Sequence, residues 1–398
     1  MPNNTQPSHR GRRLMMKLGM SVITLAMLIV VLEVGTRLLS DTQPPLLQSH
    51  PKLGTTFTPH YDGQVFVPES DRFVQLRFNG DGMRGQPFEL QKSEGVRRIA
   101  ILGDSMVAAI GANEEDTAVQ VLQQKLSNTP GPEKWEVMNF GVSGSATGQE
   151  LVLYREVVKH YQPDIVVCAF CIWNDFGDNS RELSSSPNRI YFDLNENGDL
   201  KQLKLSQSRS TISTWLNQNS RFYLWQKHAT RVATQRTKKR VGFLPKGKLI
   251  YHSEPTDELE RAWTITEKLI ETFHREVESD GSQFVLAVLP SADQIHDENW
   301  SRIISNAGSS SPQMDADYPS ERLGQLCDRI GVPVIDMVEA FREAAPSRSR
   351  AQSNEWQHFG GVGHFNQSGN RLAAEEIFNY LVQQKASTAS RQPPIEQR

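Results

Sequence analysis

Five short apolar segments, separated by longer stretches with helical spacing, constrain the fold of this chain most strongly. They lie at residues 98–102, 136–140, 164–170, 283–289 and 333–336. Between them, hydrophobic residues recur three and four positions apart, as in 151–161 and 259–277, a spacing typical of amphipathic helices. This alternation predicts an α/β fold with three layers, in which helices cover both faces of a parallel five-stranded sheet.

The composition is that of a folded, nearly neutral protein. The chain has 398 residues, is 37% hydrophobic and carries a formal net charge of -3. Because nucleic-acid-binding surfaces are usually strongly basic, we expect no nucleic-acid partner. Cys168 and Cys171 lie three apart in one predicted strand and therefore point to opposite faces, so we expect neither a disulfide nor a metal site between them.

The N-terminus contains an uncharged apolar stretch, residues 18–32, which follows a basic segment, residues 1–17. Extended to residue 39, this helix is long enough to cross a membrane if Glu33 lies near the interface. The basic flank predicts a cytoplasmic N-terminus and an extracytoplasmic main domain. A cleaved signal peptide is the alternative, but no small-x-small cleavage site follows the apolar stretch.

Changes in composition divide the rest of the chain. We expect an extended juxtamembrane segment at 40–96, a main domain at 97–385 and a disordered polar tail at 386–398. Residues 179–255 interrupt the strand and helix rhythm and are interpreted as an insertion over the carboxyl edge of the sheet.

Two features of this insertion have competing interpretations. Residues 193–198 imitate the start of a calcium loop, but the twelfth position is Lys204, so we expect a hairpin turn there. Trp215 and Trp225 are expected to pack the insertion against the core, with a lid or a membrane-facing role as the alternative.

Candidate catalytic residues follow the predicted strands. Ser105 comes directly after the first strand, in a tight Gly-Asp-Ser turn, where parallel sheets expose ligand-binding groups. A serine hydroxyl needs a base within hydrogen-bond reach to act as a nucleophile. His364 precedes a helix start near the C-terminus, and a nearby helix N-terminus would keep its imidazole neutral and able to accept that proton.

Two further residues are candidates for stabilising an oxyanion. Gly144 follows the second strand and has no side chain to block the approach of its backbone N-H to a substrate oxygen. Asn174 follows the third strand and supplies a neutral amide donor at the same edge of the sheet.

Ser105, Gly144, Asn174 and His364 resemble, in order and position, the four sequence blocks of the SGNH (GDSL-type) hydrolase superfamily, over residues 97–381. The resemblance implies a flavodoxin-like SGNH hydrolase fold. It also implies that the serine attacks an acyl carbonyl, that the serine and glycine N-H groups with the asparagine amide hold the oxyanion, and that the histidine moves the proton. The upstream NGDGMRG and the N-terminal helix look like a membrane-anchored branch of that superfamily.

The chain departs from the family pattern at two positions. Gly361 stands where the family usually has an aspartate, which predicts either a Ser-His dyad or a substitute carboxylate such as Glu355 or Asp336. Ile172 stands where the third block more often has glycine, and its bulk could narrow the acyl pocket.

The sequence therefore predicts a membrane-anchored serine esterase without metal or organic cofactor, whose partners are the membrane and an ester substrate such as an acylated glycan or lipid. Two alternatives stay open. One is an O-acyltransferase or O-acetyltransferase acting on envelope polysaccharide. The other is a catalytically silent binding module, which the glycine at position 361 suggests.

Overall fold

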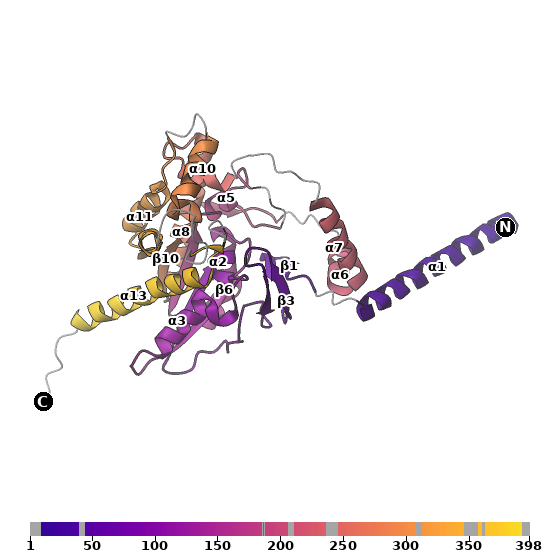
Figure 1. Cartoon of the computed structure of the whole chain (residues 1–398), viewed down its shortest axis with the longest axis horizontal. Helices are drawn as coiled ribbons and strands as arrows, with labels where there is room; N and C mark the ends of the chain where they lie inside the picture. Colours follow the sequence, from indigo (N-terminus) through magenta and orange to yellow (C-terminus); the bar gives the residue numbers. More distant parts are fainter. Residues whose placement is uncertain are drawn as a thin grey trace, which may run out of the picture. The chain divides into compact units, whose positions relative to one another are not determined.

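The computed structural model describes residues 9–39, 44–184, 186, 188–205, 211–235, 246–307, 313–345, 357–359 and 363–391. The larger of its two compact units comprises Leu46–Ser208 and Val241–Arg398 and is built around a five-stranded parallel sheet, of which β6 and β10 are labelled in Figure 1. The strand order of this sheet is β11-β10-β7-β5-β6. The strands are β5 (Val96–Gly103), β6 (Lys134–Gly141), β7 (Ile165–Cys171), β10 (Gln283–Leu289) and β11 (Val334–Asp336). This order places the first strand of the sheet between the second and the third, which is the flavodoxin-like arrangement, and the predicted fold class is confirmed.

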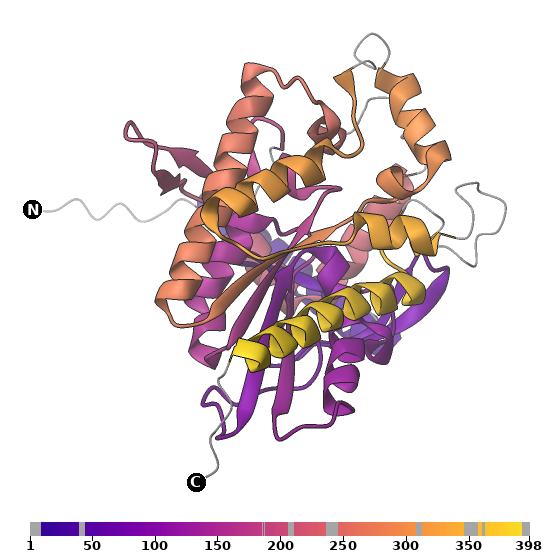
Figure 2. The ribbon, with the colours of Figure 1, turned by 90° about the vertical axis from the view of Figure 1, so that its left-hand side faces the viewer.

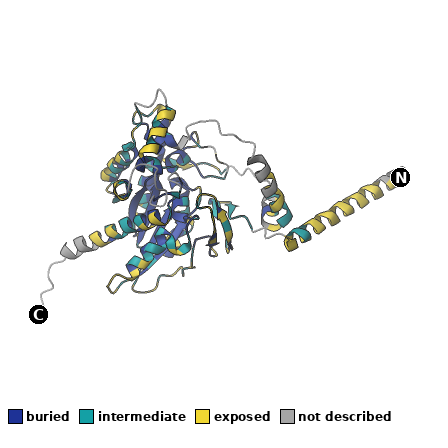
Figure 3. Ribbon diagram, viewed as in Figure 1, coloured by how far each residue is buried: buried dark blue, intermediate teal, exposed yellow. Residues whose placement is uncertain are grey.

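Helices cover both faces of this sheet, because side chains on both faces of its central strands β7 and β10 are apolar and buried (Figure 2). On one face, α3 (Ala118–Ser127) packs against α13 (Gln367–Arg391). On the other, α4 (Thr147–Glu156) packs against α8 (Asp257–Ser279), followed by α11 (Tyr318–Ile330). The sheet and the inner sides of these helices form one continuous buried core, drawn dark blue in Figure 3.

Short elements connect these layers. They are α2 (Ser105–Ala108), η1 (Glu114–Asp116), η2 (Val158–Tyr161), α5 (Asp175–Asn179), η3 (Lys246–Tyr251), α9 (Ala292–Ile295), α10 (Asp297–Ala307) and α12 (Val338–Ala344). β8 (Phe192–Leu194) and β9 (Leu200–Gln202) pair antiparallel around the Asn-Gly turn, so the hairpin predicted at residues 193–198 is confirmed.

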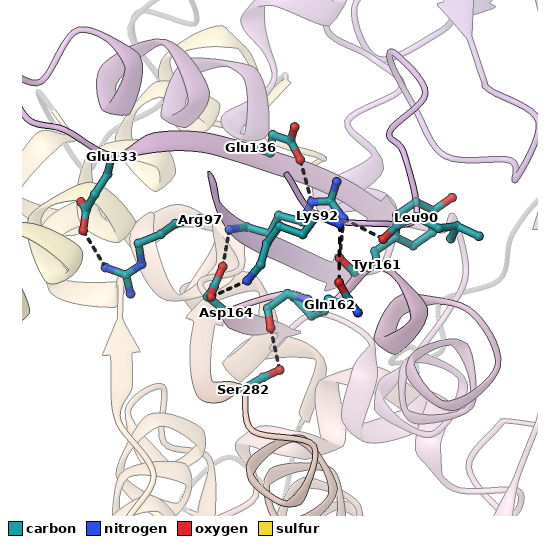
Figure 4. Close-up of polar contacts among 11 residues, drawn as sticks. Leu90, Lys92, Arg97, Glu133, Glu136, Tyr161, Gln162, Asp164 and Ser282 are labelled. Atoms are coloured by element: carbon teal, nitrogen blue, oxygen red, sulfur yellow. Dashed lines mark hydrogen bonds and ion pairs between the residues drawn. The ribbon is translucent and has the colours of Figure 1, made fainter. Parts of the chain in front are cut away.

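Polar contacts that involve Glu136, Tyr161 and Asp164 tie the amino end of the sheet together (Figure 4). Arg98 is 1% exposed and donates to Glu136 at 2.6 Å and to the backbone carbonyl of Tyr161 at 2.6 Å. Asp164 accepts from the Arg98 backbone N-H at 2.7 Å and from Lys92 at 2.7 Å. Because a buried guanidinium is costly unless its donors are paired, these contacts fix the end of the sheet opposite to the catalytic candidates.

The segment before the sheet is more regular than the expected extended stretch. It contains two antiparallel hairpins, β1 (Leu47–His50) with β2 (Gly54–Phe57) and β3 (Asp62–Val67) with β4 (Arg72–Arg77). Apolar residues alternate along β3 and β4, and their inner side chains form a small separate core with Phe57 and Phe78. This segment is therefore a folded part of the domain with its own small core, and not the extended stretch that was predicted.

A second compact unit comprises Met1–Pro45 and Arg209–Arg240. Its helices are α1 (His9–Leu39), α6 (Thr211–Asn219) and α7 (Arg221–Gln235). Residues Met15–Leu39 of α1 have a mean hydropathy of 2.3 in their most apolar part, so this helix is long and apolar enough to cross a membrane. The middle of the expected insertion therefore groups with the N-terminal helix and not with the sheet.

Within this unit, the carboxylate of Glu33 caps the start of α7. It accepts hydrogen bonds from the Ser220 hydroxyl at 2.8 Å and from the backbone N-H groups of Arg221 at 3.0 Å and Phe222 at 3.1 Å. A carboxylate at a helix N-terminus is stabilised by these free donors and by the helix dipole. Trp215 and Trp225 of this unit are 60% and 50% exposed, and their packing against the core of the other unit stays a prediction.

The C-terminal helix is longer than expected. α13 ends at Arg391, so residues 386–391, which were predicted to belong to a disordered tail, are helical. Alanines favour helix there, and the helix ends before the Pro393-Pro394 pair, whose preceding residue is disfavoured in helical conformation. The rest of the predicted tail, 392–398, lies outside the described residues.

Candidate active site

Ser105 lies at the carboxyl end of the central strand β5. It begins the short helix α2, whose N-cap Asp104 accepts a hydrogen bond from the Met106 N-H at 2.8 Å. The chain can turn this tightly because Gly141 of the neighbouring strand leaves room, since a Cβ at Gly141 would lie 2.3 Å from the Ala108 nitrogen. The turn fixes the serine at the edge of the sheet.

The structure brings His364 into direct contact with Ser105. The Ser105 hydroxyl donates to Nε2 of His364 at 2.8 Å, and Nδ1-H of His364 donates to Oε2 of Glu69 at 2.6 Å. The His364 backbone N-H lies 3.3 Å from the same carboxylate oxygen. These contacts have the geometry of a nucleophile, a base and a carboxylate that orients the base.

Glu69 was not among the residues predicted from the sequence. It lies in the turn between β3 and β4, in the segment expected to be extended, and is 295 residues away from His364 in the chain. Nδ1 of His364 contacts Glu69 and not the proposed substitute Asp336, which accepts from the Val338 N-H at 2.9 Å. Glu355 and Gly361 lie outside the described residues.

The pKa of His364 is shifted in the direction opposite to the one expected. Burial opposes protonation of the imidazole, but the hydrogen bond and negative charge of Glu69, with a contribution from Asp104, raise its pKa above the usual 6.5. The expectation of a helix N-terminus that disfavours imidazolium is therefore corrected, because the Glu69 carboxylate dominates. The same contact lowers the pKa of Glu69, despite its partial burial, and keeps it ionised.

Gly144 follows β6, which pairs directly with β5. Its φ is +79°, in the left-handed region that glycine adopts readily, and a Cβ here would meet open space. The Gly144 carbonyl accepts a hydrogen bond from Arg189 at 3.1 Å. The loop thus has a fixed backbone and an unobstructed side at the edge that carries Ser105.

Asn174 follows β7, the other neighbour of β5. Its amide nitrogen donates to Asp175 at 3.2 Å and to Asp178 at 3.4 Å, both long hydrogen bonds. The adjacent Trp173 packs edge-on against the His364 ring with centroids 5.5 Å apart. Ile172 is fully buried in the main core.

Three buried carboxylates adjoin the site. Asp104 precedes Ser105, Asp175 follows Asn174, and Glu150 on α4 accepts from Ser145 at 3.1 Å, next to Gly144. Burial and then the charge of Asp104 raise the pKa of Glu150 to about 8, and burial raises the pKa of Asp175 and of Asp104. Burial and the charges of the neighbouring carboxylates both favour the protonated form of this cluster.

The raised pKa of Glu150 predicts a pH-dependent stability. The folded protein retains a proton on Glu150 that the unfolded chain loses near the ordinary pKa of 4.5, so the free energy of unfolding falls as the pH rises from about 4.5 to 8. Glu150→Gln should flatten this fall and raise the melting temperature at pH 8 more than at pH 5. Thermal unfolding followed by circular dichroism checks this, with Glu196→Gln in an exposed turn as the control. An unchanged pH profile in Glu150→Gln would contradict the assignment.

Metal ligation has no evident site in the described ranges. Within them, no three His, Cys, Asp or Glu side chains are grouped so that they could hold a metal ion. Cys168 and Cys171 are free thiols, and burial raises the pKa of both well above the usual value. Both belong to the buried core of the sheet.

Comparison with known proteins finds similarity among solved structures only. No family model matches the chain, and no curated protein matches it. An acetyl xylan esterase, AlAXEase, is 14% identical with a TM-score of 0.39, covering 71% of this chain and 99% of that one. A two-domain esterase active on acetylated mannans is 12% identical with a TM-score of 0.40, covering 73% and 50%. A lipase/acylhydrolase from Enterococcus faecalis is 16% identical with a TM-score of 0.38, covering 72% and 96%.

Proposed function

We propose that this chain is a serine esterase that cleaves carboxylic esters through an acyl-enzyme. The observation that carries the proposal is the chain of hydrogen bonds from Ser105 through His364 to Glu69. A serine hydroxyl bonded to an imidazole whose other nitrogen is held by a carboxylate is an activated nucleophile. The three residues come from distant parts of the sequence, so local folding alone does not account for their contact.

The reaction follows from these positions. His364 takes the Ser105 proton as the hydroxyl oxygen attacks the ester carbonyl, and Glu69 stabilises the imidazolium that forms. The N-H groups of Ser105 and Gly144 and the amide of Asn174 hold the oxyanion, and the long hydrogen bonds of Asn174 to Asp175 and Asp178 can be exchanged for it. His364 then protonates the leaving alcohol. Water, deprotonated by the same imidazole, releases the acid and restores Ser105.

Product analysis tests this function against acyl transfer. The full-length protein in detergent should release acetate from 4-nitrophenyl acetate, with a rate that does not depend on added glycan hydroxyl groups. If instead the acetyl group appears on an added oligosaccharide while acetate release stays low, the chain is an acyltransferase. If the well-folded protein gives neither product, the esterase proposal fails.

We further propose that α1 remains as a membrane anchor and that the sheet-containing unit lies outside the cytoplasm. Two features support this: the basic residues before the apolar stretch, and the capping of α7 by Glu33. A signal peptide removed after α1 would leave the start of α7 without the carboxylate that satisfies its donors.

Retention of the anchor predicts an intact N-terminus. Protein extracted from membranes should have the mass of a chain that includes α1, and alkaline carbonate should not release it. Glu33→Ala should leave the protein in the membrane but increase proteolysis within residues 211–235, because α7 loses its cap. A mature chain that starts near residue 40 would contradict the anchor.

A further inference from the structure

We propose that the outer face of the β3-β4 hairpin, together with the cavity beside it, binds a neutral O-acylated polysaccharide. The proposal rests on the esterase function above and names the substrate class. We call this surface the glycan face and define it by Gln64, Phe66, Phe73, Gln75 and Arg77.

Strand alternation places these side chains on one side of the hairpin. Phe66 lies opposite Phe73, and Gln64 lies opposite Gln75. Phe66 is 47% exposed and Phe73 is 67% exposed, with ring centroids 5.3 Å apart. The inner residues between them, Val74 among them, are buried in the small core of the hairpin. The outward phenylalanines therefore add nothing to that core, and their exposure calls for a ligand.

The same face continues into a polar cavity of about 460 Å³. Gln75 and Arg77 form its wall on the hairpin side, and Asn113, Glu114 and Gln120 lie among the residues opposite. Arg77 also pairs with Asp62 on the same face at 3.6 Å. Amide, carboxylate and guanidinium groups line this hollow, and its described lining contains no apolar side chain.

Aromatic rings beside amide and carboxylate groups match the chemistry of a sugar chain. A sugar ring has an apolar C-H face that packs on an aromatic ring and hydroxyl groups that exchange hydrogen bonds with amides and carboxylates. Glu114 and Glu115 outnumber Arg77 in the cavity, which disfavours a polyanionic glycan. The polar cavity also disfavours a lipid tail, which needs a continuous apolar surface.

The hairpin links the glycan face to the reacting atoms. Glu69, which holds His364, lies in the turn only three residues beyond Phe66. At about 3.3 Å per strand residue, Arg77 lies about 13 Å along the strand from Phe73. A polysaccharide lying along the hairpin would therefore reach from the cavity past the phenylalanine pair toward Ser105, with room for more than one sugar ring.

Binding measurements on the full-length protein test this. Ser105→Ala protein in phosphatidylcholine nanodiscs is titrated with O-acetylated hexasaccharides of xylan and mannan, and the Kd is measured by calorimetry. An O-acetylated hexamer of mannuronate serves as the anionic ligand for comparison. Adding Phe66→Ala and Phe73→Ala should raise the Kd for a neutral glycan about tenfold or more. Leu90→Ala removes an exposed apolar side chain elsewhere and should leave the Kd unchanged.

A second variant and a second readout keep the test decisive. Gln75→Ala with Arg77→Ala should also weaken binding, which covers the case in which the phenylalanine variant does not fold. Neutral glycan should slow hydrogen exchange in residues 62–77. The proposal is overturned if neither double variant changes the Kd, if only the anionic hexamer binds, or if nanodisc lipid and not glycan protects residues 62–77. If the wild-type protein reacts with a phosphonate at Ser105 but no glycan binds, the glycan face is rejected. The proposed esterase function would not be affected by that result.

Discussion

Replacing Ser105 by alanine should lower kcat/KM for a short activated ester by about 10⁵-fold or more. In the proposed reaction, the hydroxyl that lies 2.8 Å from Nε2 of His364 is the atom that forms the acyl bond, and the variant removes it. Substrate binding and oxyanion stabilisation would survive, so a small residual rate above water is expected. Hydrolysis of 4-nitrophenyl acetate, followed by absorbance, measures the loss.

The control for this variant is Ser127→Ala on α3, where the hydroxyl only accepts a hydrogen bond from Gln123 at 2.9 Å. It should retain the wild-type rate and melting temperature. Activity kept by a folded Ser105→Ala protein would assign the nucleophile to another residue and end the proposed mechanism.

Glu69→Gln should lower kcat by about 10³- to 10⁴-fold. The neutral amide keeps the size of the side chain but cannot stabilise the imidazolium, and it can donate to Nδ1 and so favour the wrong tautomer. KM should change little, because the proposed role of Glu69 is to hold the His364 imidazole, which it contacts at 2.6 Å. Glu69→Asp should recover part of the loss, and Glu196→Gln should have no effect.

The pH profile separates this role from a merely structural one. Glu69 raises the pKa of His364, and the reaction needs the neutral imidazole, so kcat/KM should rise with pH through a pKa above 6.5 in the wild type. In Glu69→Gln the pKa of His364 should be lower, because the protonated imidazole has lost its ionic partner. The rise of the residual kcat/KM with pH should therefore begin at a lower pH than in the wild type. An unshifted acid limb would mean that another group orients His364.

Sequence patterns revealed the sheet because buried parallel strands are continuous apolar runs with little ambiguity. Each predicted strand overlaps an observed one, from β5 to β11. Ser105, Gly144 and Asn174 follow three such runs, so placing the strands also placed these residues at one edge. The positions of these three residues could be predicted from the strands alone, because a parallel sheet brings the carboxyl ends of its strands to one edge.

Glu69 could not be found in this way. Its partner His364 lies almost at the other end of the chain, and the turn that holds Glu69 has neither a motif nor a spacing that points to a histidine. Only the packing of the β3-β4 hairpin brings the two together. The period-two alternation of residues 72–77 was the available signal, and it predicts a strand but not the contact made by the turn.

The insertion shows the same limit of local patterns. The Asn-Gly turn between β8 and β9 was predictable because it is set by neighbouring residues. The contact of α7 with α1 includes the hydrogen bonds of Glu33, whose partners start at Ser220. Contacts over that separation are decided by tertiary structure, which the local pattern of residues does not specify.

The mass of the protein after reaction with a fluorophosphonate tests the central claim most directly. We predict one covalent adduct per chain, mapped to Ser105 by peptide sequencing, that forms faster as the pH rises through the pKa of His364 and is absent from His364→Ala. A fully folded chain that forms no adduct, or that carries it on a different residue, would contradict the account of Ser105 as a nucleophile activated by His364 and Glu69.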